Sequence, residues 1–129
     1  TVEKIWNDNN NQDGVRPNSV QVQLYRDGSK YGNSITLGDS ILTYTWSGLL
    51  DGYTYIVKEL NSNGNIVADG EEYNKDYTTN YQVNGNKTTI INTIIWDSNV
   101  AFLILLYSFA PIFCEQNVRA PWENPFIAV

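Results

Sequence analysis

The first 93 residues predict an all-β fold, a sandwich of two sheets with about seven strands. Short runs in this segment alternate apolar and polar residues with a period of two, the pattern of a strand with one buried face. Clusters of Asn, Asp, Gly and Pro separate the runs and favour turns. No segment keeps a helical period beyond a turn or two. These observations together favour a β-sandwich over a helical domain.

The order of the alternating runs sets the expected strands. Val2, Lys4 and Trp6 share one face of the first strand, and a loop rich in Asn, Asp and Gly follows it. The other expected strands are residues 20–24, 34–37, 43–49, 53–60, 77–83 and 88–93. Asp27-Gly28 predicts a turn after the second strand. Asn84-Gly85 predicts a hairpin that joins the last two.

Aromatic residues of the middle strands follow the same alternation. Tyr44, Trp46, Tyr53 and Tyr55 are in phase with core positions. We therefore expect them in the core of the sandwich rather than on a platform that binds carbohydrate.

The composition excludes several classes of function. With 14 acidic against 8 basic residues among 129, the chain has a formal net charge of −6, which argues against nucleic acid or an anionic membrane as a partner. It has no His and a single Cys, which excludes His-based acid–base catalysis, His or Cys metal clusters and an intramolecular disulfide. Any chemistry must therefore use Lys, Asp, Glu, Asn or Tyr, and we expect no cofactor.

The Asn-rich loop invites one metal interpretation. Asp8, Asn10 and Gln12 alternate as in a calcium-binding EF-hand loop. Gly14 comes one position late for the required turn, however, and the twelfth position is Ser19 instead of Glu. Turns capped by side chains are the favoured interpretation, and we expect no metal site.

The composition changes near Thr93, so we expect a domain at residues 1–93 and an extension of unknown role at 94–129. Within the extension, residues 100–114 are apolar apart from one Ser. This run of about 15 residues is shorter than the roughly 20 that a spanning helix needs, and Pro111 would interrupt a helix. Membrane association, packing as strands on the sandwich, and an unnatural extension all remain open for this segment. The lack of an initiating Met and a secretory signal indicates a processed or excised piece.

Three polar residues fall where the alternation places the core. Lys4 lies in the inward phase of the first strand, Glu59 in that of residues 53–60, and Asn92 in that of the last strand. Because isolated buried charges are costly, Lys4 and Glu59 should meet inside the sandwich or shift their pKa values. One interpretation is a buried salt bridge with the Asn beside it. The other is a reaction in which a neutral Lys attacks the Asn carboxamide, a protonated Glu shuttles protons, and an isopeptide bond forms with release of ammonia.

Several segments resemble the Cna B-type domain, the B-type repeat domain of collagen adhesins. This family is found in Gram-positive surface proteins and pilins. Residues 4–17 (KIWNDNNNQDGVRP) and 20–25 (VQVQLY) are similar to its opening. Residues 43–49 (TYTWSGL) and 55–59 (YIVKE) resemble its middle, and 90–93 (IINT) resemble its last strand. The resemblance covers residues 2–93 in the family's order.

This resemblance implies a two-sheet, immunoglobulin-like (transthyretin-like) sandwich with an autocatalytic isopeptide bond. Lys4 and Asn92 occupy the crosslinking positions of the family motif, and Glu59 occupies the position of the residue that promotes the reaction. The bond would tie the first strand to the last. The protein would then be no enzyme in the usual sense, because the reaction is a single turnover on itself.

The function that the resemblance implies is a structural stalk or repeat module of an adhesin or pilin-like protein. Its location would be extracellular, at the cell surface or cell wall of a Gram-positive bacterium. Its partners would be neighbouring repeat domains, with a host extracellular-matrix protein as a further candidate. Two alternatives stay open: a module that binds a host protein or glycan on the same scaffold, and a membrane-tethered fragment that uses residues 100–114.

Overall fold

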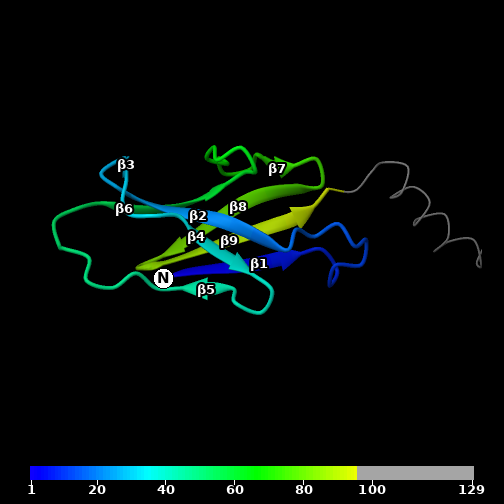
Figure 1. The fold of residues 1–129 in the computed structure, drawn as a ribbon, viewed down its shortest axis with the longest axis horizontal. Helices are drawn as coiled ribbons and strands as arrows, with labels where there is room; N and C mark the ends of the chain where they lie inside the picture. The colour runs from blue at the N-terminus through cyan, green and yellow to red at the C-terminus, as the bar shows by residue number, and fades with distance from the viewer. Residues whose placement is uncertain (96–129) are drawn as a thin grey trace, which may run out of the picture. The chain divides into compact units, whose positions relative to one another are not determined.

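Residues 1–95 are the part of the chain that the computed structural model describes, and their nine strands form two sheets (Figure 1). The first sheet has the strand order β5-β1-β9-β8-β7. Its members are β1 (Val2–Asn7), β5 (Thr43–Tyr44), β7 (Glu72–Asn74), β8 (Tyr77–Asn84) and β9 (Lys87–Ile94). In the second sheet, β6 pairs with one edge of β2. The other edge of β2 pairs with β4 along residues 19–22 and with β3 along residues 25–26. Its members are β2 (Ser19–Arg26), β3 (Ser29–Lys30), β4 (Ile35–Gly38) and β6 (Tyr55–Leu60). The predicted all-β sandwich of two sheets is confirmed.

The strand count differs from the expected seven because two short strands escape a pattern-based prediction. β3 has two residues and β7 has three, which is too short to show alternation. The expected strand at residues 43–49 shrinks to Thr43–Tyr44. Val2, the first residue of β1, pairs with Tyr44, so the chain beyond Tyr44 runs past the end of its partner strand.

The first and last strands lie side by side and parallel in the first sheet (Figure 1). In their register, Lys4 is paired with Ile90 and Trp6 with Asn92. The predicted hairpin between β8 and β9 is confirmed, with Gly85 at a φ of 61° that favours glycine. Residues about 90 positions apart in sequence therefore become neighbours, and this arrangement places the site described below.

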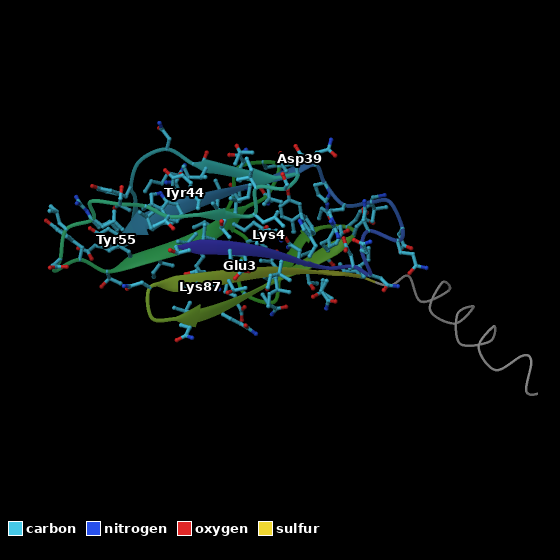
Figure 2. All side chains as sticks on the ribbon, turned by 90° about the horizontal axis from the view of Figure 1, so that it is seen from below. Glu3, Lys4, Asp39, Tyr44, Tyr55 and Lys87 are labelled. Atoms are coloured by element: carbon cyan, nitrogen blue, oxygen red, sulfur yellow. The ribbon has the colours of Figure 1, made fainter. Side chains whose placement is uncertain are left out.

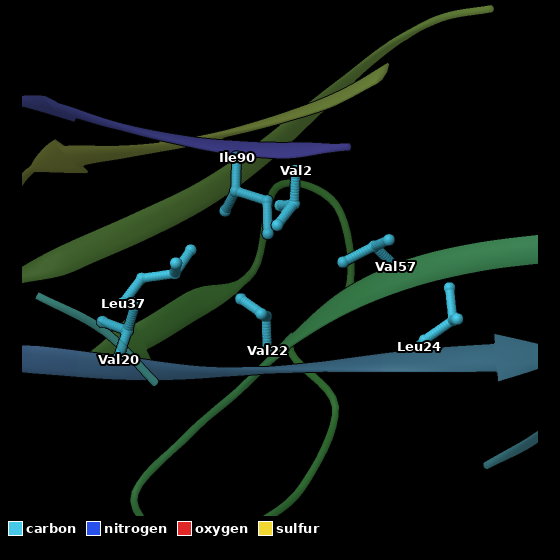
Figure 3. Close-up of a cluster of buried hydrophobic side chains, with 7 residues drawn as sticks. All are labelled: Val2, Val20, Val22, Leu24, Leu37, Val57 and Ile90. Carbon is cyan, nitrogen blue, oxygen red and sulfur yellow. The ribbon is translucent and has the colours of Figure 1, made fainter. Parts of the chain in front are cut away.

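Apolar residues from the inner faces of both sheets form the core between them (Figure 3). Five strands, β1, β2, β4, β6 and β9, supply the buried cluster, and β2 contributes three alternate residues. The buried cluster consists of Val2, Val20, Val22, Leu24, Leu37, Val57 and Ile90.

The expectation of a buried aromatic set is correct for two residues and wrong for two. Trp46 and Tyr55 are partly buried and pack against the core. Tyr44 and Tyr53 are 39% and 43% exposed, respectively. Tyr44 belongs to β5, a two-residue strand at the edge of its sheet. Tyr53 lies in the chain between β5 and β6, which is not a continuous strand, so alternation does not determine its face.

No helix in the part of the chain that the structure describes is long and apolar enough to cross a membrane. The expectations for the apolar run at residues 100–114 lie outside the described residues.

Candidate crosslinking site

Three strands bring Lys4, Glu59 and Asn92 together inside the sandwich. Lys4 lies on β1 and Asn92 on the adjacent β9, while Glu59 on β6 reaches them from the second sheet. Their side chains point inward because each falls in the buried phase of its strand, and their exposed fractions are 2%, 0% and 0%. Glu3, the residue before Lys4, points to the opposite face and pairs with Lys87 at 2.5 Å (Figure 2).

The three side chains form a closed set of contacts. Lys4 Nζ donates a hydrogen bond to Asn92 Oδ1. It also lies 3.6 Å from Glu59 Oε2, and Asn92 Nδ2 donates to Glu59 Oε1 at 3.0 Å. The amine, the carboxyl group and the carboxamide therefore each contact the other two. The structure brings together all three residues that the sequence singled out.

Burial makes Lys4 a better nucleophile than an exposed lysine. Desolvation lowers the pKa of Lys4 to about 8, although the nearby Glu59 carboxylate acts in the opposite direction. At pH 7 about one amine in ten is then neutral, against fewer than one in a thousand for an exposed lysine. The face of Trp6 lies 3.9 Å from Nζ and supports the charged form of the amine without offering a hydrogen-bond acceptor.

The sequence reasoning missed a fourth polar residue of the site, Thr79 on β8. It is fully buried, and its hydroxyl donates to Glu59 Oε1 at 2.7 Å and accepts from Asn92 Nδ2 at 2.8 Å. A signal was available, because Thr79 follows Tyr77 in the inward phase of its strand. Threonine is common in strands, however, so its phase alone does not mark it as part of a site.

A second buried polar cluster orders the Asn-rich loop. Arg16 donates to both oxygens of Asp8, and the Tyr77 hydroxyl donates to Asp8 Oδ2 at 2.7 Å. The backbone N–H of Asn11 also donates to Asp8 Oδ1 at 3.0 Å. The hydrogen bonds from Arg16 and Tyr77 hold the pKa of Asp8 well below its usual range, against the effect of burial. Asp8 thus fixes the loop to the sandwich, with both carboxylate oxygens taken by protein donors.

A pocket of about 570 Å³ lies at the end of the sandwich formed by the β8–β9 turn and the segment before β6. Aromatic and aliphatic side chains line part of it, with Leu50 60% exposed and Val83 72% exposed. Asp51 and Asn86 add polar groups to the lining.

The fold and the buried triad define a class of protein, the immunoglobulin-like sandwich with a Lys on its first strand, an Asn on its last strand and a Glu that reaches both from the facing sheet. The chain belongs to the Cna protein B-type domain family, whose sequence profile matches residues 1–93. It is 52% identical over 50 residues to a collagen adhesin of Staphylococcus aureus, a match that covers 38% of this chain and 4% of the adhesin.

A solved structure agrees with this family. The crystal structure of two B repeat units of the collagen-binding protein of Staphylococcus aureus is similar, with a TM-score of 0.58 and 36% identity. The similarity covers 73% of this chain and 24% of that one. The chain thus spans a small part of each of these relatives.

Proposed function

We propose that residues 1–93 form a structural repeat of an adhesin or pilin-like protein at the cell wall of a Gram-positive bacterium. The repeat locks itself with an isopeptide bond between Lys4 and Asn92, and Glu59 promotes the reaction. The observation that carries the proposal is the mutual contact of an amine, a carboxyl group and a carboxamide in a fully buried site. A salt bridge alone would not require the carboxamide to lie against the amine.

The reaction begins with a proton that Lys4 and Glu59 share. When the proton resides on Glu59, the neutral Nζ attacks the side-chain carbonyl carbon of Asn92. After the attack, the protonated carboxyl group gives its proton to Nδ2, which lies 3.0 Å from Oε1, and the carboxylate that results takes the remaining proton from Nζ through Oε2, 3.6 Å away. The bond from carbon to Nδ2 breaks, ammonia leaves, and Glu59 ends the step protonated as it began. One amide replaces another, and only ammonia is lost.

The bond would change how the domain carries tension. β1 and β9 are parallel neighbours, so a pull on the start of β1 and the end of β9 acts along the strands in opposite directions. With the crosslink in place, the force passes from Lys4 directly to Asn92. The 87 residues between them carry no load, because their two ends are joined covalently; Lys4 and Asn92 are 88 positions apart. A domain that cannot lengthen under load suits a stalk.

The relatives support the proposed setting. One is named a collagen adhesin, and the similar crystal structure contains two consecutive B repeat units. We infer that neighbouring repeats are the first partners of this domain and that a host matrix protein is the target of the whole adhesin. The domain itself is not an enzyme that turns over a substrate, because its proposed reaction consumes its own side chains.

Intact mass spectrometry tests the proposal. The wild-type protein should be lighter than its sequence by one ammonia molecule, and Lys4→Arg and Glu59→Gln should both restore the sequence mass. Lys87→Arg is the matched control, since this lysine forms a surface ion pair away from the triad and its variant should keep the deficit. A wild-type mass equal to the sequence mass would overturn the proposed crosslink.

A second candidate function is binding of a host protein or glycan on the same scaffold, and the pocket beside β6 favours it. Pockets of this size that combine aromatic and polar groups are typical of ligand sites. Titration of the purified domain with collagen peptides and with a glycan panel tests this candidate. Binding that Tyr53→Ser weakens would support it, and absence of binding to either panel would leave the stalk function alone.

A further inference from the structure

We propose that Thr79 is a positioning residue for the crosslinking reaction, an inference that rests on the proposed bond between Lys4 and Asn92. Its hydroxyl sets the orientation of the Asn92 carboxamide and assigns the two oxygens of Glu59 to different tasks. Thr79 lies on β8, the strand next to β9, and its side chain is fully buried against both residues.

The hydroxyl has one proton, and its partners determine where that proton points. Before the reaction, while the shared proton resides on Lys4, Glu59 is an ionised carboxylate that can only accept, so the hydroxyl 2.7 Å from Oε1 donates to it. The same oxygen can then only accept from Asn92 at 2.8 Å. A directional chain results, from Asn92 Nδ2 through Thr79 Oγ1 to Glu59 Oε1.

This chain fixes which end of the carboxamide faces the amine. The Nδ2 group is surrounded by three acceptors: Thr79 Oγ1, Glu59 Oε1 and, at 3.4 Å, the carbonyl oxygen of Thr78. A carboxamide turned over would place its oxygen against these acceptors and its NH₂ group against the Lys4 amine. The observed orientation directs the carbonyl toward Lys4 and the leaving nitrogen toward Glu59, as the reaction requires.

The same hydroxyl separates the roles of the two carboxylate oxygens. Thr79 and Asn92 both bind Oε1, whereas Oε2 has no hydrogen-bond partner in the described part of the chain and lies 3.6 Å from Lys4 Nζ. Oε2 is thus free to take the proton from the amine, and Oε1 is held beside the leaving nitrogen. Without the hydroxyl, Glu59 could rotate and place both oxygens near Lys4.

The test uses the full chain, recovered unfolded with its mass still equal to that of the sequence and diluted into folding buffer at neutral pH. Tryptophan fluorescence follows folding, and intact mass follows the loss of ammonia. Thr79→Val keeps the shape of the side chain and removes the hydroxyl, so we expect normal folding and at least about tenfold slower crosslinking, the effect of one lost hydrogen bond. Thr79→Ser keeps the hydroxyl and should crosslink at nearly the wild-type rate.

The controls separate this inference from the proposed function. Thr89→Val makes the same substitution on β9, at a position whose side chain lies on the face opposite to Asn92, and should leave the rate unchanged. Thr79→Ala provides a second hydroxyl-free variant if the valine variant does not fold. Loss of ammonia by Thr79→Val at the wild-type rate, or equal slowing by the valine and serine variants, would overturn the role of the hydroxyl and leave the crosslink standing. Absence of ammonia loss in the wild type would overturn the crosslink itself.

Discussion

Removal of the crosslink should lower the stability of the domain by an amount that its position in the chain determines. The perturbation is the double variant Lys4→Met with Glu59→Gln. Methionine removes the nucleophile at similar volume, and glutamine avoids an unpaired carboxylate in a site where both side chains are fully buried. The double variant therefore loses the covalent bond without leaving a buried charge alone.

The magnitude follows from the length of the closed loop. Lys4 and Asn92 are 88 positions apart, and a covalent link over a loop of that length restricts the unfolded chain by about 4–5 kcal/mol. For a domain of this size, 1 kcal/mol corresponds to about 5 °C in the melting temperature, so the double variant should melt about 20 °C below the wild type.

Thermal unfolding followed by circular dichroism measures this difference, with intact mass confirming which proteins are linked. The single variant Lys4→Met should melt lower still, because it leaves Glu59 buried without its cation. A double variant that melts within about 5 °C of the wild type would refute the reasoning from chain entropy.

Three further predictions follow from the geometry. In single-molecule pulling, the wild type should release no length from residues 5–91, whereas Lys4→Met with Glu59→Gln should release about 300 Å at full extension; equal lengths would contradict the load path through the crosslink. During refolding, the rate of ammonia loss should be level near neutral pH and fall about tenfold per pH unit above the Lys4 pKa of about 8, because the pair then loses its shared proton. A rate that rises through that pH would mean that Glu59 acts only as a base. Finally, Asp8→Asn should lower the free energy of unfolding at pH 7 by about 3 kcal/mol in denaturant titrations. Because Arg16 holds the folded pKa of Asp8 below its unfolded value, this contribution is present above about pH 4 and shrinks as the pH falls further; a constant difference down to low pH would contradict it.

The sequence was sufficient to place the triad in the interior. A period of two fixes the face on which a side chain lies, so Lys4, Glu59 and Asn92 could be assigned to the buried side of their strands without knowledge of the sheet order. The contact among them could not be derived in this way. It depends on the parallel pairing of β1 with β9 and on the approach of β6 from the other sheet, both of which join residues far apart in sequence.

The sequence reasoning made errors where the surroundings of a residue, and not the face of its strand, decide the outcome. Tyr44 and Tyr53 were assigned to the core by alternation, but Tyr44 ends a two-residue strand at the edge of its sheet and is 39% exposed. Tyr53 precedes β6 and lies in no strand, so alternation does not determine its face. Thr79 was overlooked although alternation correctly places it on the buried face of its strand. A threonine in a strand is unremarkable until its neighbours across the sheet are known.

A peptide map of the wild-type protein tests the central claim most directly. Trypsin does not cleave after a lysine whose amine is part of an amide, nor between Arg16 and Pro17, so the crosslinked protein should yield one branched peptide that joins residues 1–26 to residues 88–119. Its mass should equal the sum of the two linear peptides less one ammonia, and its fragment ions should place the branch between Lys4 and Asn92. Recovery of residues 1–4 and 5–26 as separate peptides, with residues 88–119 at their sequence mass, would contradict the account.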